Sequence, residues 1–246
     1  MAGIEKLLAV DWFAQEKLYY CGPAVAQMFL NHFGLAVSQD DLWADIKANS
    51  NGSGSSNPPS SNTDPDFPKQ VCENCDGVNP PVWTCWNATP AALQKTVMGR
   101  TSKATLDMHY PLTFEEGVTH LIESIDRSPG VPPFATITSV NHWVVVSGYL
   151  QNDLTSTAFP AEQIGKYKLN GLYLRDPQSA GTPDSFKLVS VAAWHEQFGL
   201  IACASSPNVD RYPVVVGTDA KNNSWWVVGA VAVALLLLFI WLWYQA

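Results

Sequence analysis

Four residues have the types and the chain order that a thiol-dependent catalytic site requires. A glutamine, a cysteine, a histidine and an aspartate follow one another as Gln15, Cys21, His142 and Asp176. A deprotonated thiol is a strong nucleophile, and a neighbouring histidine stabilises it and later gives a proton to the leaving amine. A carboxylate can orient the imidazole ring, while a side-chain amide and a backbone N–H can together stabilise an oxyanion.

Each of these residues, taken alone, has an ordinary structural explanation. A cysteine at the start of a helix is usually a small buried residue, and a histidine at a strand start is usually structural. Asp176 precedes Pro177, as turn-forming aspartates often do. The set is informative because cysteine, then histidine, then aspartate or asparagine is one known chain order for this catalytic geometry.

The segment that follows Cys21 is predicted to be a helix. In CGPAVAQMFLNHFG, residues 21–34, apolar side chains recur at helical spacing, at Val25, Met28, Phe29, His32 and Phe33. Pro23 suits the first turn of a helix, and Gly34 suits its C-terminal end. Cys21 is therefore expected at a helix N-terminus, where the helix dipole favours a negative charge.

The other elements place helices early in the chain and strands late. Ser38 with Asp41 resembles a capping box for a helix through about residue 48, Thr89-Pro90 begins a helix that Gly99 ends, and Thr113 with Glu116 begins one through about residue 127. Strands are predicted for the β-branched and aromatic runs 134–140, 142–150 and 171–176. This order predicts an α+β fold, with a helical N-terminal part that carries the nucleophile and a C-terminal antiparallel sheet.

Three motifs together carry a resemblance to a known family. FAQEKLYYCGPAVAQMFL, with its glutamine six residues before the cysteine, resembles the nucleophile region of papain-like cysteine peptidases. With NHWVVVSGY and LYLRDP it is similar to the bacteriocin-processing (double-glycine leader) peptidase-like branch, over roughly residues 12–200. The resemblance implies a papain-like fold, with Cys21 as nucleophile, His142 as base, Asp176 as the residue that orients it and Gln15 as oxyanion donor.

The chain also departs from that branch. Exporters of the branch fuse the peptidase to transmembrane and ATPase domains, but this sequence has no G-x-x-x-x-G-K-[ST] motif. Cleavage of double-glycine leaders is therefore not implied. An insertion at 49–88, which begins rich in Ser, Asn, Gly and Pro, is expected to be flexible, and either a substrate-selecting lid or a spacer would explain it.

Composition excludes some functions. The 246 residues are 47% hydrophobic, enough for a sizeable core, and the net charge is −8. No basic patch is visible that would neutralise nucleic-acid phosphates, so nucleic acid is not an expected partner. The sequence suggests no cofactor, and the expected partners are a peptide or protein substrate and a lipid bilayer.

The remaining cysteines leave several explanations open. Residues 1–10 are too short and too weakly apolar for a secretory signal, so the domain is expected to fold in a reducing compartment. Cys72, Cys75 and Cys85 would be part of a zinc site only if a fourth ligand such as Asp76 or His109 joined them. A disulfide and plain thiols are the alternatives, and Cys203 is expected in the core.

Residues 225–244 predict a membrane-spanning helix. The run WWVVGAVAVALLLLFIWLWY carries no charge, and 20 helical residues at about 1.5 Å each span a bilayer's hydrocarbon core. Tryptophan and tyrosine lie at both ends, as at membrane interfaces. The nearby basic residues Arg211 and Lys221 precede the helix, which predicts that the N-terminal part faces the cytoplasm.

The sequence therefore predicts a peptidase domain at 1–210, a juxtamembrane linker at 211–224 and a membrane helix at 225–244. The favoured function is a membrane-anchored cysteine peptidase that works through a thioester acyl-enzyme. A transglutaminase-like acyl or amide transferase on the same scaffold and a catalytically inactive membrane-anchored binding module are the alternatives.

Overall fold

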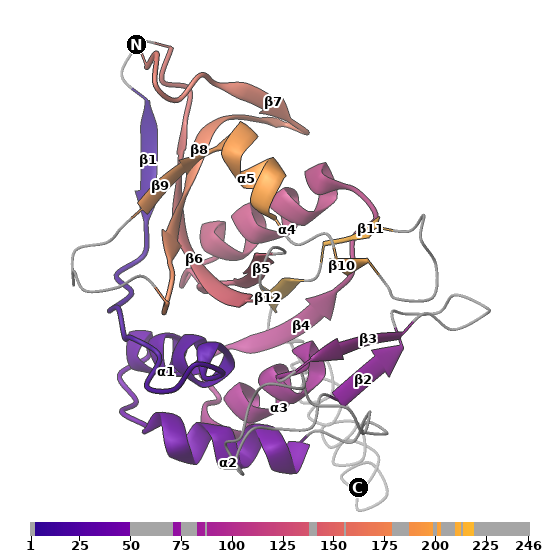
Figure 1. Cartoon of the computed structure of the whole chain (residues 1–246). Helices are drawn as coiled ribbons and strands as arrows, with labels where there is room; N and C mark the ends of the chain where they lie inside the picture. The colour runs from indigo at the N-terminus through magenta and orange to yellow at the C-terminus, as the bar shows by residue number, and fades with distance from the viewer. Residues whose placement is uncertain are drawn as a thin grey trace, which may run out of the picture.

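The computed structural model describes residues 3–49, 71–74, 83–86, 88–137, 142–154, 156–178, 187–198, 201–202, 210–212 and 214–218. Within these ranges the helices are α1 (Cys21–His32), α2 (Gln39–Asn49), α3 (Pro90–Arg100), α4 (Phe114–Asp126) and α5 (Val191–Gln197). The first three gather at one end of the molecule, while α4 and α5 lie nearer the other (Figure 1).

The helix boundaries follow from their caps. The hydroxyl of Ser38 accepts from the Asp41 N–H at 3.1 Å, the hydroxyl of Thr89 from Ala92 and that of Thr113 from Glu116. These bonds satisfy N–H groups that have no partner inside a helix. At the end of α1, Gly34 takes φ +78°, and the Leu35 N–H bonds back to the Leu30 carbonyl at 2.9 Å. The predicted start signals of these helices and the end of α1 at Gly34 are confirmed, but α3 continues through Gly99 to Arg100, with Thr101 as its C-cap.

The main sheet is antiparallel and has β6 at its centre. The strand order is β4-β12-β5-β6-β8-β7, with β1 also paired to β6 and β9 to β8. Along one edge of β6, β5 pairs with its first half and β1 with its second half, while β8 occupies the other edge. The strands are β1 (Ile4–Leu7), β4 (Thr105–His109), β5 (Phe134–Ile137), β6 (His142–Gln151), β7 (Glu162–Ile164), β8 (Tyr167–Arg175), β9 (Lys187–Ser190) and β12 (Val214–Thr218).

Helices cover both faces of this sheet. Successive side chains of a strand point to opposite faces. Trp143 and Val145 of β6 belong to a core shared with α1, α2 and α3, whereas Val144 and Val146 belong to a second core shared with α4 and α5. Because β6 is buried on both sides, it reads in sequence as a continuous apolar run rather than an alternating one.

The α+β class with an antiparallel sheet is confirmed, but the predicted separation into a helical half and a sheet half is incomplete. Strand β1 opens the described chain and pairs with β6, and α4 and α5 are interleaved with the strands. Helix α5 and the strands β1, β4, β7, β9 and β12 were not predicted from the sequence, because each is too short to establish a clear hydrophobic period. Residues 138–140 of the first predicted strand lie outside the described residues.

Much of the insertion at 49–88 and the whole segment 225–244 lie outside the described residues. Part of the insertion forms an antiparallel pair, β2 (Val71–Asn74) with β3 (Trp83–Trp86). A second short pair joins β10 (Ile201–Ala202) to β11 (Asp210–Arg211). Within the part of the chain that the structure describes, no helix has the length and apolar character needed to cross a membrane.

Close packing at Gly22 sets the distance between α1 and the start of β6. A methyl group added at Gly22 would come within 2.5 Å of the Ala88 side chain and 4.0 Å from the Trp143 ring. The Trp143 indole in turn donates to the Ala88 carbonyl at 2.9 Å. Glycine is needed here because any larger side chain would force the first turn of α1 away from the sheet.

The substitution Gly22→Ala should destabilise the fold. The added methyl group overpacks a site lined by the side chains of Ala88, Ile46 and Trp143, at a cost of about 1–3 kcal/mol. Urea unfolding would measure it. Gly99→Ala is the matched control, because nothing lies within 4 Å of the position in α3, and there the helix should gain about 0.5–1 kcal/mol. Equal stability of the two variants would contradict this account.

Candidate active site

Cys21 is the first residue of α1 and the one free cysteine among the side chains that the structure describes. The first turn of the helix holds no acidic residue. The dipole of α1 and its unpaired N–H groups therefore act on the Cys21 sulfur without a competing carboxylate on the same turn. The thiol lies in a mostly covered position, since Cys21 is 7% exposed.

His142 is the first residue of β6 and is likewise buried. Ile137 of β5 pairs with it, and the next residue, Trp143, is fixed by its bond to the Ala88 carbonyl. Because Gly22 packs against this same tryptophan, the start of α1 and the start of β6 meet. The structure thus brings Cys21 and His142 together, although they lie 121 positions apart in the sequence.

Asp176 directly follows β8, which neighbours β6 in the sheet. Its Oδ1 accepts from His142 Nε2 at 2.6 Å and from the Gln178 N–H at 2.8 Å. Burial raises the pKa of Asp176, but these two hydrogen bonds and the charges of His142 and Lys187 together lower it by more, so the net pKa lies below the ordinary value. The carboxylate therefore stays ionised beside the imidazole.

The histidine is held in its charged form. Burial lowers the pKa of His142, while hydrogen bonding and charge attraction to Asp176 and to the Cys21 side chain together raise it by more, and the resulting pKa is about 9. An opposite charge within hydrogen-bonding distance favours the protonated ring over the neutral one. At neutral pH, the arrangement therefore holds an imidazolium between a carboxylate and a sulfur.

Gln15 lies on a segment that contacts the Asp176 turn. Its backbone N–H donates to the Pro177 carbonyl at 2.9 Å, and the Trp12 indole donates to the Asp176 carbonyl at 2.7 Å. The side-chain Nε2 of Gln15 donates to the Leu18 carbonyl at 3.0 Å. One N–H of the amide is thereby fixed, and the second N–H is left for another acceptor.

A model of a known family matches most of this chain. The family model described as "Peptidase_C39 like family" matches residues 7–187, which is more than two thirds of the chain and includes all four predicted site residues. This chain belongs to the Peptidase_C39-like family. A search of curated proteins finds no match. The antiparallel sheet with helices on both faces is consistent with the papain-like peptidase fold expected of this family.

Trp12 is a site residue of this Peptidase_C39-like chain that sequence reasoning missed. Its indole supports the backbone of Asp176 and so the carboxylate that faces His142. No motif spacing indicates this role, because the contact joins positions 164 residues apart. The only local signal is an aromatic residue just ahead of the Phe13-Ala14-Gln15 sequence, and that signal alone would suggest core packing.

The predicted zinc site gains no support from the described residues. Among them, no group of three or more His, Cys, Asp or Glu side chains could hold a metal ion. In the backbone register Cys72 stands opposite Cys85, but the side chains of both, together with Cys75 and Cys203, lie outside the described residues. The zinc and disulfide hypotheses therefore stay predictions.

His109 stacks on His120 with ring centroids 4.3 Å apart, and His195 stacks on Phe114.

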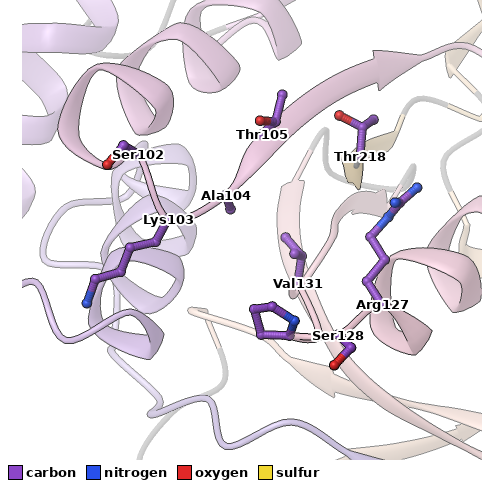
Figure 2. A pocket seen from close by; sticks show the side chains of 9 residues that line it. Ser102, Lys103, Ala104, Thr105, Arg127, Ser128, Val131 and Thr218 are labelled. Carbon is purple, nitrogen blue, oxygen red and sulfur yellow. The ribbon is translucent and has the colours of Figure 1, made fainter. Parts of the chain in front are cut away.

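Two cavities among the described residues lie away from the Cys21–His142 pair. The one in Figure 2 has a volume of about 170 Å³ and is lined by Ser102, Lys103, Ala104, Thr105, Arg127, Ser128, Pro129, Val131 and Thr218. Thr105 pairs with Thr218 at the ends of β4 and β12, and neither of these strands neighbours β6, which bears His142. The second, of about 340 Å³, lies beside α1 and the loop from Leu35 to Ser38.

Replacing Asp176 with asparagine should lower the pKa of His142 from about 9. The variant keeps the shape of the side chain but loses the charge that stabilises the imidazolium. Titration of the His142 ring by NMR measures the change, with Asp126→Asn as a control because Asp126 bonds Lys6 and Tyr149 instead. An unchanged pKa in Asp176→Asn would contradict the assignment.

The same pKa predicts how stability depends on pH. The value of about 9 in the folded chain exceeds the 6.5 of an ordinary histidine. The stabilising contribution of protonated His142 is therefore complete below pH 6.5 and is lost as the pH rises through about 9. Thermal unfolding followed from pH 6 to pH 10 should show a loss of stability across this window that is smaller in Asp176→Asn.

Proposed function

We propose that this chain is a cysteine peptidase in which Cys21 is the nucleophile and His142 its acid–base partner. The observation that carries the proposal is the pairing of His142 Nε2 with Asp176. With that nitrogen occupied, the other ring nitrogen, Nδ1, is the one available to the Cys21 thiol, whose hydrogen bond contributes to the raised pKa of His142. Asp176 and Cys21 would thus each bind a different nitrogen of the His142 ring.

The chemistry proceeds in two balanced steps. The Cys21 sulfur attacks the carbonyl carbon of a peptide bond, the C–N bond breaks, and His142 gives its proton to the departing amine. This step forms a thioester between Cys21 and the acyl part of the substrate. Water, deprotonated by the now neutral His142, then attacks the thioester, which releases a carboxylic acid and returns the proton and the thiol–imidazole pair.

Gln15 and the backbone at Cys21 would stabilise the oxyanion that forms in both steps. The Leu18 carbonyl fixes one N–H of the Gln15 amide, and the second N–H can donate to a developing negative charge. The Cys21 backbone N–H belongs to the start of α1, where the amide groups have no partner inside the helix. Donors that are fixed before the reaction require no rearrangement as the charge develops.

Replacing the nucleophile tests the proposal most directly. Cys21→Ala should abolish cleavage of a fluorogenic peptide selected from a library, and His142→Ala should lower kcat by at least about 100-fold. His195→Ala serves as the control, since its ring only stacks on Phe114.

Mapping of new N-termini in cells, wild type against Cys21→Ala, would identify natural substrates, and product masses would separate hydrolysis from transfer to an amine. Full activity in Cys21→Ala would overturn the proposal.

The pH dependence of cleavage carries a second test. Because the pKa of His142 is about 9, kcat/KM should fall on the alkaline side with an apparent midpoint near that value, where the imidazolium needed to protonate the leaving amine is lost. The midpoint belongs to the interacting pair rather than to the histidine alone. Asp176→Asn should move it to lower pH. An alkaline limb that does not respond to Asp176→Asn would argue against this acid.

We further propose that residues 225–244 anchor the peptidase to a membrane with the N-terminal part in the cytoplasm. The support is the uncharged 20-residue run with aromatic residues at both ends. Anchoring would concentrate the enzyme near membrane-bound peptide or protein substrates.

Charges placed in the run should release the protein from membranes. Arginine at the centre of a spanning helix costs about 2.5–3.5 kcal/mol for each residue. In carbonate extraction of membranes, the wild type should therefore stay in the pellet, and the double variant Leu236→Arg with Leu237→Arg should become extractable. Alanine at both positions is the matched control. Extraction of the wild type itself would refute the anchor.

A further inference from the structure

Gln39, the first residue of α2, carries an almost fully buried side-chain amide whose oxygen and nitrogen are both hydrogen-bonded. Gln39 is 1% exposed. Its Oε1 accepts from the Glu16 N–H at 2.9 Å, while its Nε2 donates to the Ala14 carbonyl at 2.7 Å and to Gln27 Oε1 at 2.9 Å. No sequence motif indicates a role for this residue.

The two backbone groups that Gln39 binds lie on either side of Gln15. The Ala14 carbonyl belongs to the peptide unit before Gln15, and the Glu16 N–H belongs to the peptide unit after it. On its other side, Gln15 donates its own N–H to the Pro177 carbonyl. The backbone of Gln15 is therefore held between α2 and the Asp176-Pro177 turn, which also bears the carboxylate partner of His142.

A second amide fixes which way the Gln39 side chain points. Gln27 on α1 accepts from Gln39 through its Oε1 and donates through its Nε2 to the Val37 carbonyl at 3.0 Å. Turning either amide over would place oxygen against oxygen or two N–H groups against each other. The chain of bonds therefore allows one orientation, and such chains strengthen one another in a buried setting.

Core packing alone does not account for a glutamine at this position. Helix α2 contributes Leu42, Trp43 and Ile46 to the apolar core. A buried amide with satisfied bonds adds little net stability over an apolar side chain of the same shape, but it fixes the geometry of the groups that it binds. At Gln39 those groups are the peptide units of the predicted oxyanion donor.

We propose that Gln39 is a positioning residue for the oxyanion site, holding Gln15 so that its side-chain amide faces the carbonyl under attack at Cys21. This inference rests on the peptidase function proposed above. Gln39 touches neither substrate nor reacting atoms and acts only through the backbone of Gln15. Shifting a donor by a fraction of an ångström weakens its bond to the oxyanion more than its bond to the neutral carbonyl of the bound substrate.

The test replaces Gln39 with methionine, which keeps the length of the side chain and removes its hydrogen bonds. In the full chain, kcat for the library-selected peptide should fall about tenfold, a part of the 100- to 1000-fold that loss of an oxyanion donor costs. KM should stay within about twofold. Gln94→Met is the matched control, because Gln94 also donates to a backbone carbonyl, that of Leu106, and its kcat should not change.

Alkylation separates the oxyanion site from the thiol–imidazole pair. Iodoacetamide reacts by displacement at a saturated carbon and forms no oxyanion, so its rate at Cys21, followed by peptide mass spectrometry, should stay within about twofold in Gln39→Met. A loss of alkylation as large as the loss of kcat would show general damage to the site and would overturn the positioning role.

The decisive measurement combines Gln39→Met with Gln15→Ala. If Gln39 acts through Gln15, adding Gln39→Met to the Gln15→Ala variant should lower kcat by less than about twofold, because the group being positioned is already gone. The same tenfold loss in the presence and absence of the Gln15 side chain would overturn the proposal. Unchanged hydrogen exchange at the Glu16 amide in Gln39→Met would also overturn it, since loss of its acceptor should speed that exchange.

Failure of the peptidase function would give a different result. If the wild type showed no Cys21-dependent cleavage of any library peptide, both the peptidase function and the catalytic role of Gln39 would fall together. An active wild type with an equally active Gln39→Met variant would overturn the role of Gln39 alone.

Discussion

The close approach of α1 to the start of β6 is the constraint on which the candidate site depends. Gly22 has no side chain, so the first turn of α1 can lie against Ala88 and the Trp143 ring. That contact places the Cys21 sulfur beside a histidine that begins a central strand. A cysteine at a helix start becomes a candidate nucleophile when an imidazole is held close to its sulfur. Here the packing of α1 against β6 holds that imidazole in place.

Around this contact, the site is assembled from four separate parts of the chain. Cys21, the candidate nucleophile, comes from a helix, and His142 and Asp176 come from the ends of neighbouring strands. Gln15 comes from an N-terminal segment bonded to the Asp176-Pro177 turn. Most of the connecting bonds run to backbone groups. Such bonds fix the positions of the site residues without adding charge near the Cys21 sulfur. Among the described residues, Asp176 is the only carboxylate that binds His142.

The electrostatics follow from burial combined with pairing. A buried histidine by itself would be neutral, because burial lowers its pKa. The carboxylate of Asp176 and the sulfur of Cys21 reverse that tendency in this chain, and the pKa of His142 rises to about 9. The ring is therefore kept as a proton donor over the whole physiological range, which is the state that protonation of a leaving amine requires.

The sequence by itself determined the local features: where α1 begins, the caps of the later helices, the α+β class, and the set Gln15, Cys21, His142 and Asp176. These are decided by residues that lie close together in the chain or by motifs whose order is informative. The tertiary structure decided which ring nitrogen meets Asp176, that Trp12 supports that aspartate, and that Gln39 holds the peptide units beside Gln15. No sequence period encodes such contacts, because they join residues up to 164 positions apart through side chains whose partners exist only once the layers have packed.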